Sequence, residues 1–272
     1  MAALGIGMVV MFGSGCVAIP LTGAKRERAV VYTPTWWPER LTADVYRPQP
    51  PSGRPAPAVL LVHGGGMRGE GARWEMNGIA ARLVKRGYVV MNVTYRSIPT
   101  YPYPAPVEDL RQALKWLRAH AAEYGIDRQR IATFGYSAGG YLAALVALQG
   151  GPGNARVRAI VAGGAPFDLR FYPGGNLIPT YLGGNQQEVP ELYDEASPVN
   201  YVQRDSPPIF IYQGSSDSLV RPEHALRMQA VCNVMGARCE VHWLPGHGHL
   251  GTFLCSGPVV KQAIDFLDRE MK

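Results

Sequence analysis

The sequence predicts an α/β fold in which an eight-stranded, mostly parallel sheet carries helices on both faces. Short, β-branched apolar runs of the kind found in buried strands recur along the chain. They alternate with segments whose apolar residues fall at helical spacing and which often end at glycine. Strands that alternate with helices in this way form parallel sheets. At 272 residues, with 47% hydrophobic and 18% charged residues, the chain is long enough for one such domain.

Each element is placed by its own pattern. The first two strands, residues 28–32 and 41–46, form an initial pair. Six further strands are expected at residues 58–62, 88–93, 130–134, 157–162, 208–212 and 239–243. Helices are expected at residues 75–86, 107–124, 139–148, 222–235 and 258–271. In the second of these, Val107, Leu110 and Leu114 share one face, and Gly125 ends the segment.

In two segments the apolar residues show neither helical nor strand spacing: residues 17–27 and the Gly/Pro/Tyr-rich residues 166–205. Only the second is long enough to hold a small lid. We therefore expect one domain over residues 17–272, with a small lid within 166–205.

Residues 1–16 indicate an export signal. The apolar stretch 4–12 is shorter than the roughly 20 residues that a membrane-spanning helix needs. It is followed by Gly-Ser-Gly-Cys16, which resembles the lipobox of bacterial lipoproteins, where the cysteine is lipidated after cleavage. We expect an exported protein, periplasmic or anchored to a membrane through a lipid on Cys16. Export without a lipid, and a cytoplasmic protein with an apolar N-terminus, stay open because Gly13 replaces the usual Leu and no basic residue precedes Lys25.

Charge and cysteine patterns exclude other classes. The net charge of +6 is scattered without a run of like charges, so we expect no nucleic-acid site. No Cys or His cluster has zinc spacing, so we expect no metal. In an oxidising compartment the best-placed disulfide joins Cys232 and Cys239. Cys239 is expected at the start of the last strand and Cys255 beyond its far end, roughly 17 Å away, which is too far for a disulfide. Buried free thiols remain the alternative.

The candidate nucleophile is Ser137, in the run Gly135-Tyr-Ser-Ala-Gly139 between an apolar strand and a helix. This strand, turn and helix context is the one that a nucleophile elbow needs. Glycines at 135 and 139 remove side chains that would collide in so tight a turn. The turn also lies at a helix N-terminus, which favours developing negative charge.

A second motif, His63-Gly-Gly-Gly66, follows the predicted strand 58–62. Acyl transfer passes through a tetrahedral oxyanion, which fixed N–H donors stabilise. We assign this oxyanion hole to the N–H groups of Gly64, Gly65 and Ala138. His63 is expected to serve as a structural hydrogen-bonding residue rather than as the base.

These motifs resemble the HGGG-type carboxylesterases of the α/β-hydrolase superfamily. The resemblance covers residues 55–270 and rests on HGGG at 63–66, Tyr95-Arg96, the Tyr-Pro-Ala-Pro-Val-Glu-Asp109-Leu segment, GYSAGG at 135–140 and Gly-Ser-Ser-Asp217. That group ranges from hormone-sensitive-lipase-like members to acetyl and feruloyl esterases. It implies the α/β-hydrolase fold, ester hydrolysis without a cofactor, and catalytic residues in the chain order Ser, Asp, His.

The sequence departs from the lipase-like members at two positions. Tyr136 stands where many carry Asp, and Met67 where many carry an aromatic residue. The segment before the third strand is also too short for a substantial N-terminal cap. The departures favour a compact enzyme with an open site, closer to the acetyl and feruloyl esterases.

For the acid we predict Asp217, which follows the strand 208–212 at the edge where this fold keeps its catalytic groups. Asp168, one strand earlier, is the rival. For the base, the resemblance points to the Pro-Gly-x-Gly-His ending of the last strand, hence to His249, with His247 as the alternative. His242 is expected to be structural, and His120 and His224 to lie on helix surfaces.

The expected function is hydrolysis of short-chain carboxylic esters by a Ser137-Asp217-His249 acyl-enzyme mechanism. The substrate partner would be a small-molecule or carbohydrate-linked ester. Two other functions stay open: an amide hydrolase or peptidase of the same superfamily, and a non-catalytic binding module that keeps the fold.

Overall fold

A computed structural model describes residues 24–49, 53–68, 72–150, 156–172 and 175–271. Residues 1–16, with Cys16 and the expected signal, lie outside the described residues. One eight-stranded sheet has the order β1-β2-β4-β3-β5-β6-β7-β8. Its strands are β1 (Ala24–Val31), β2 (Thr42–Pro48), β3 (Ala56–Val62), β4 (Val89–Val93), β5 (Ile126–Tyr136), β6 (Ala159–Gly163), β7 (Ile209–Gly214) and β8 (Cys239–Leu244).

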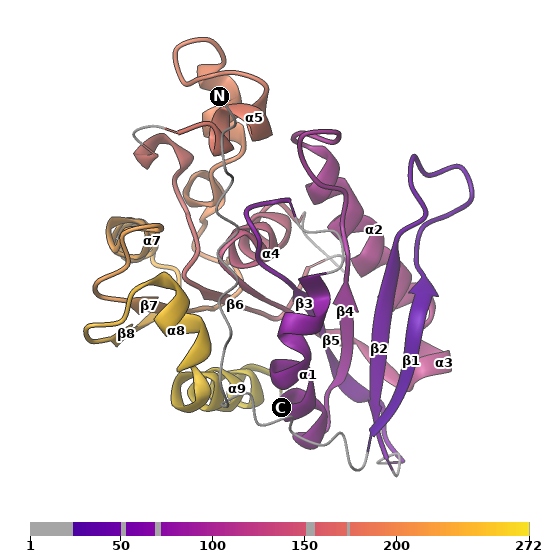
Figure 1. Cartoon of the computed structure of the whole chain (residues 1–272). Helices are drawn as coiled ribbons and strands as arrows, with labels where there is room; N and C mark the ends of the chain where they lie inside the picture. The colour runs from indigo at the N-terminus through magenta and orange to yellow at the C-terminus, as the bar shows by residue number, and fades with distance from the viewer. Residues whose placement is uncertain (1–23, 50–52, 69–71, 151–155, 173–174, 272) are drawn as a thin grey trace, which may run out of the picture.

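The sheet is mixed only at one edge (Figure 1). Strand β1 pairs antiparallel with β2, and β2 pairs antiparallel with β4. All other neighbours are parallel. The predicted fold class is therefore confirmed, and all eight strands occur where they were expected. Because β3, β5, β6, β7 and β8 are parallel, their carboxyl ends meet at one edge of the sheet.

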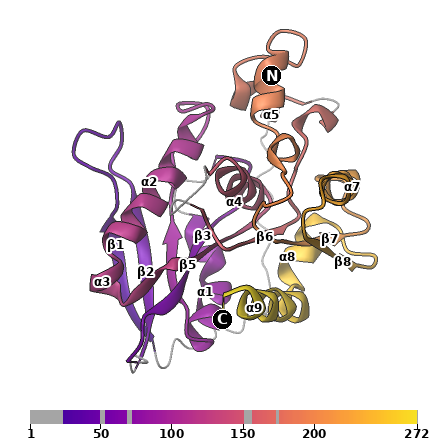
Figure 2. The same ribbon diagram turned by 180° about the vertical axis from the view of Figure 1, so that it is seen from behind.

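Helices cover both faces of the sheet (Figures 1 and 2). On one face lie α1 (Asn77–Lys85) and α9 (Gly257–Met271), which pack into one apolar cluster with the strands. The opposite face carries α2 (Ala105–Ala119), α4 (Ala138–Leu148) and α7 (Glu223–Met235). Every residue of α4 is buried, because its sequence of small and apolar residues has no polar face.

Several predicted boundaries shift. Strand β1 begins at Ala24, four residues before its predicted start and within the segment 17–27 in which no clear period was expected. The helix expected over 107–124 divides into α2 and the short α3 (Ala121–Tyr124) at His120. Strand β5 begins at Ile126, four residues before the predicted start, because Ile126 pairs with Ala56 at the start of β3. The left-handed Gly125, with φ of 66°, turns the chain from α3 into β5.

The segment 166–205 has short helical turns in place of a periodic helix. They are η2 (Leu169–Phe171), α5 (Leu177–Leu182), α6 (Pro190–Glu195) and η3 (Pro198–Tyr201). The segment rises beyond the edge where the parallel strands end, at the top of Figure 1. Its apolar residues Ile178, Tyr181 and Leu182 join the core cluster of α2 and α4.

A buried ion pair fixes the loop after β4 to α2. The Arg96 Nε donates to both carboxylate oxygens of Asp109, at 2.9 and 3.0 Å, and the Arg96 backbone N–H donates to Oδ2 at 2.8 Å. The indole N–H of Trp37, in the loop between β1 and β2, donates to Asp109 Oδ1 at 2.8 Å. Arg96 and Asp109 are among the positions on which the sequence resemblance rests. Here they join the loop after β4, the helix α2 and the loop between β1 and β2.

Within the described ranges, no helix combines the length and the apolar character needed to cross a membrane.

Candidate active site

The residue at the turn between β5 and α4 is Ser137. Its backbone has φ of 55° and ψ of −126°, a conformation that costs a non-glycine residue energy. The neighbouring glycines make the turn possible. A Cβ at Gly135 would lie 2.1 Å from the carbonyl oxygen of Gly139, and one at Gly139 would lie 2.3 Å from the carbonyl oxygens of Val62 and His63. The turn has the geometry predicted for a nucleophile elbow.

The structure brings Ser137, His249 and Asp217 together from three different segments. The His249 Nε2 lies 2.9 Å from Ser137 Oγ, and its Nδ1 lies 2.7 Å from Asp217 Oδ2. Ser137 follows β5, Asp217 follows β7, and His249 is the first residue of α8 (His249–Leu254). The imidazole therefore bridges a hydroxyl and a carboxylate, as in serine hydrolases.

The Asp217 carboxylate is fully buried and held from several sides. Its Oδ1 accepts the backbone N–H groups of Leu219, at 3.0 Å, and Val220, at 2.8 Å. The side-chain amide of Gln213 donates to Oδ2 at 3.2 Å and to the Val220 carbonyl at 2.9 Å. Sequence reasoning missed Gln213. A polar residue at the next-to-last position of the apolar strand β7, four residues before the acid, was the only available signal in the sequence.

The rival residues lie elsewhere. The Asp168 carboxylate accepts hydrogen bonds from Arg170 Nε and Nη2, both at 2.7 Å. The His247 Nδ1 lies 2.9 Å from the Pro245 carbonyl oxygen. Of the alternatives, Asp217 and His249 are the pair that the fold places beside Ser137.

The glycines of the 63–66 motif lie against the nucleophile. A Cβ at Gly64 would lie 3.3 Å from Ser137 Cβ and 3.1 Å from the Tyr136 carbonyl oxygen. Gly65 and Gly66 have φ of 98° and 62°, left-handed values that favour glycine and let the chain turn after Gly64. In the part of the chain that the structure describes, no backbone carbonyl accepts from the N–H of Gly64, Gly65 or Ala138.

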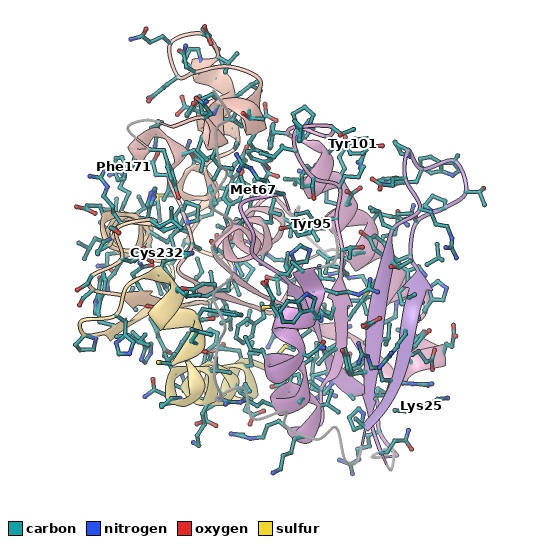
Figure 3. All side chains as sticks on the ribbon, viewed as in Figure 1. Lys25, Met67, Tyr95, Tyr101, Phe171 and Cys232 are labelled. Carbon is teal, nitrogen blue, oxygen red and sulfur yellow. The ribbon has the colours of Figure 1, made fainter. Side chains whose placement is uncertain are left out.

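Tyr95, which is labelled in Figure 3, supports this loop together with His63. The centroids of their stacked rings lie 4.5 Å apart. The Tyr95 hydroxyl donates to the carbonyl oxygens of His63, at 3.0 Å, and Gly64, at 3.2 Å. Burial lowers the pKa of His63 to about 4, so the ring is neutral near pH 7. Its Nδ1 lies 2.8 Å from the Gly64 carbonyl oxygen. His63 is thus structural in its contacts, as expected.

The expectation for His224 was wrong. This residue is buried on α7, on the face that also carries Met228 and Cys232, at spacings of four residues. The Asp168 N–H donates to its Nδ1 at 3.4 Å. Burial lowers the pKa of His224 to about 4.

The thiols of Cys232, Cys239 and Cys255 are free in this structure. Cys232, on α7, and Cys239, at the start of β8, hydrogen-bond to each other, and this bond lowers the pKa of Cys232. The two residues are thus neighbours, and their disulfide remains a prediction for oxidising conditions. Among the described residues, no three His, Cys, Asp or Glu side chains are grouped to hold a metal ion.

The family model described as BD-FAE matches residues 43–231. The chain belongs to this family. Among curated proteins, it is 30% identical over 240 residues to esterase LipQ of Mycobacterium tuberculosis, covering 81% of this chain and 57% of that protein. It is also 30% identical over 257 residues to esterase LipC of the same organism, covering 85% and 62%. The chain thus spans less than two thirds of the length of these relatives.

Solved structures confirm the fold of this BD-FAE member. A truncated carbohydrate esterase from gut microbiota superposes with a TM-score of 0.83 at 24% identity, covering 91% of this chain and 96% of that one. A thermophilic esterase from Thermogutta terrifontis superposes with a TM-score of 0.74 at 25% identity, covering 91% and 92%. The predicted α/β-hydrolase fold and the resemblance to carboxylesterases are therefore confirmed.

Proposed function

We propose that the protein is a serine esterase that cleaves carboxylic esters through an acyl-enzyme intermediate. The observation that carries this proposal is the continuous contact from Ser137 Oγ through both nitrogens of His249 to Asp217. The names of the M. tuberculosis relatives, which are esterases, support the same reaction.

In the first step, Ser137 Oγ attacks the ester carbonyl while His249 Nε2 takes the hydroxyl proton. Asp217 holds Nδ1 and stabilises the imidazolium that forms. His249 then gives the proton to the leaving alcohol, and the acyl group remains on Ser137. Water, activated by His249 in the same way, attacks this ester and frees the acid.

The oxyanion of each tetrahedral intermediate would lie between the N–H groups of Gly64, Gly65 and Ala138. Ala138 is the first residue of α4, so its N–H lies where a helix leaves such groups unbonded. Gly64 lies beside the Ser137 side chain, at the distances given above. Removal of one such donor typically costs about 3 kcal/mol of transition-state stabilisation.

We propose short-chain esters of a polyhydroxyl alcohol as the substrate class. A hollow of about 1170 Å³ runs along the 166–205 segment, and its lining is rich in amide and hydroxyl groups. These groups are on Asn176, Thr180, Asn185, Gln186, Gln187 and Tyr193. Tyr172 also lines this hollow, and it lies near the acid: burial and then the charge of Asp217 raise the pKa of Tyr172 to about 12. A hollow lined by such polar groups suits a sugar-like alcohol better than a long acyl chain.

A series of p-nitrophenyl esters tests the acyl part of this proposal. We expect acetate to butyrate to be cleaved with higher kcat/KM than decanoate, and Ser137→Ala to abolish both activities. A preference of about tenfold or more for the long-chain ester would contradict the short-chain assignment. An amide substrate such as p-nitroacetanilide, cleaved as fast as the ester, would favour the amide-hydrolase alternative.

We further propose export and lipid attachment at Cys16, supported by the apolar stretch 4–12 and the lipobox-like ending. Cells that express the full-length sequence and grow with an alkyne-bearing palmitate should yield a labelled protein, and Cys16→Ser should abolish the label. Labelling that survives in the variant would contradict the proposal.

A further inference from the structure

The residue directly before the nucleophile, Tyr136, reaches across to the base. Its side chain is buried at the end of β5. Its hydroxyl donates to the backbone carbonyl of His249 at 2.6 Å. A short bond of this kind from a buried donor is a specific contact, because a buried hydroxyl that loses its acceptor costs free energy. Strand β5, which ends at Tyr136 directly before the nucleophile, therefore also contacts the backbone of His249.

The ring of Tyr136 makes a second contact with the same segment. Its centroid lies 5.2 Å from that of the His249 imidazole, with the planes tilted by 40°. It lies 4.9 Å from that of Phe253, one turn further along α8. Ring and hydroxyl together support both the imidazole and the first turn of the helix that carries it.

Two consecutive glycines make room for this ring and for a second tyrosine ring that stacks on it. A Cβ at Gly164 would lie 2.9 Å from Cζ and from the hydroxyl oxygen of Tyr136. A Cβ at Gly163 would lie 2.0 Å from Cζ of Tyr212, whose ring stacks on Tyr136 at 5.8 Å. Since any side chain at these positions would displace the rings, the end of β6 is built around the tyrosine pair.

The segment that carries His249 needs such support. It follows Gly246 and Gly248, and α8 is only six residues long, too short to be stable by itself. Burial, followed by the charge of Asp217, holds the pKa of Tyr136 far above its usual value, so the hydroxyl stays protonated and remains a donor.

We propose that Tyr136 is a positioning residue for the base: it fixes the start of α8 so that the His249 imidazole stands between Asp217 and Ser137. This inference rests on the proposed esterase mechanism. A residue at this elbow position that lacks a hydroxyl at this reach, such as the Asp of many lipase-like members, could not make the same bond. The bond therefore depends on the tyrosine at this elbow position.

The test compares Tyr136→Phe with Tyr212→Phe. Each variant loses one buried hydroxyl from the same ring pair, but among the described residues the Tyr212 hydroxyl has no hydrogen-bond partner. We expect Tyr136→Phe to lower kcat for p-nitrophenyl acetate by about tenfold with KM within about twofold, because orientation acts on the chemical step. The rate at which a fluorophosphonate labels Ser137 should fall by the same factor. Tyr212→Phe should retain both rates.

A second background separates positioning from a general loss of structure. In His249→Ala no imidazole remains to be oriented, so adding Tyr136→Phe should not lower the residual rate further. Phe253→Leu, which keeps the hydroxyl bond but loses the ring contact, should lower kcat about threefold and serves if Tyr136→Phe is unstable.

The inference is overturned if folded Tyr136→Phe keeps the full labelling rate. It is also overturned if the tenfold loss persists in the His249→Ala background. In either case an active wild-type enzyme leaves the esterase proposal intact, whereas a wild-type protein that neither cleaves esters nor accepts the label overturns the esterase proposal as well.

Discussion

Acidification should destabilise the protein through its buried histidines, and His224 allows this to be measured away from the active site. Its native pKa of about 4 lies below the ordinary value of 6.5 that the unfolded chain has. The folded protein therefore binds fewer protons than the unfolded chain between these pH values, and stability falls as the pH falls from 6.5 to 4. At pH 5, protonation of His224 favours the unfolded state about 30-fold, which lowers the free energy of unfolding by about 2 kcal/mol.

The assay is urea unfolding of the wild type and of His224→Asn, whose side-chain oxygen can accept the Asp168 N–H that His224 Nδ1 accepts. Other groups titrate in the same range, so the informative quantity is the difference between the two proteins. From pH 7 to pH 5 the variant should lose about 2 kcal/mol less free energy of unfolding than the wild type. From pH 7 to pH 8, where His224 is mostly neutral in both states, the two should change alike to within about 0.2 kcal/mol. Equal losses on acidification would refute the burial argument.

Three further predictions follow from the contacts. Asp109→Ala should lower the free energy of unfolding by about 2 to 4 kcal/mol in urea titrations, because it removes the carboxylate to which Trp37 and the buried Arg96 donate and leaves Arg96 only Glu108 and the Ala105 carbonyl; a loss below about 1 kcal/mol would contradict this. His249→Ala should lower kcat by about three to six orders of magnitude, while His247→Ala should cost about tenfold at most; the reverse order would move the base to His247. Peptide mapping of unreduced protein exported from cells should find Cys232 joined to Cys239, and recovery of both as free thiols would reject the bridge.

The centre of the sheet, from β3 to β7, could be predicted from the sequence because its strands are nearly continuous apolar runs, as a parallel sheet covered on both faces requires. The edge strands β1 and β8 contain charged residues and are only partly buried, so they were placed from shorter apolar runs and from the alternation of strands with helices. The short helices α5, α6 and α8 were not predicted. Each has six residues, fewer than two turns, so it shows too little periodicity to separate from a loop.

The residues of the site likewise divide into those that could be predicted from the sequence and those that could not. Ser137, Asp217 and His249 follow from local motifs and from the rule that parallel strands bring their ends together. Gln213 and the Tyr136 bond to His249 depend on which side chains meet across β5, β7 and α8. Such contacts between segments leave no pattern within any one segment, so Tyr136 was visible only as a departure from the related sequences.

The central claim, that Ser137 is a nucleophile activated by its contacts, is tested most directly by fluorophosphonate labelling followed by peptide mass spectrometry. The wild-type protein should carry one adduct, on the peptide that contains Ser137. His249→Ala should slow the labelling by at least about a thousandfold, and Ser137→Ala should abolish it. An adduct on another residue, or a wild-type protein that stays unlabelled while folded, would contradict the account.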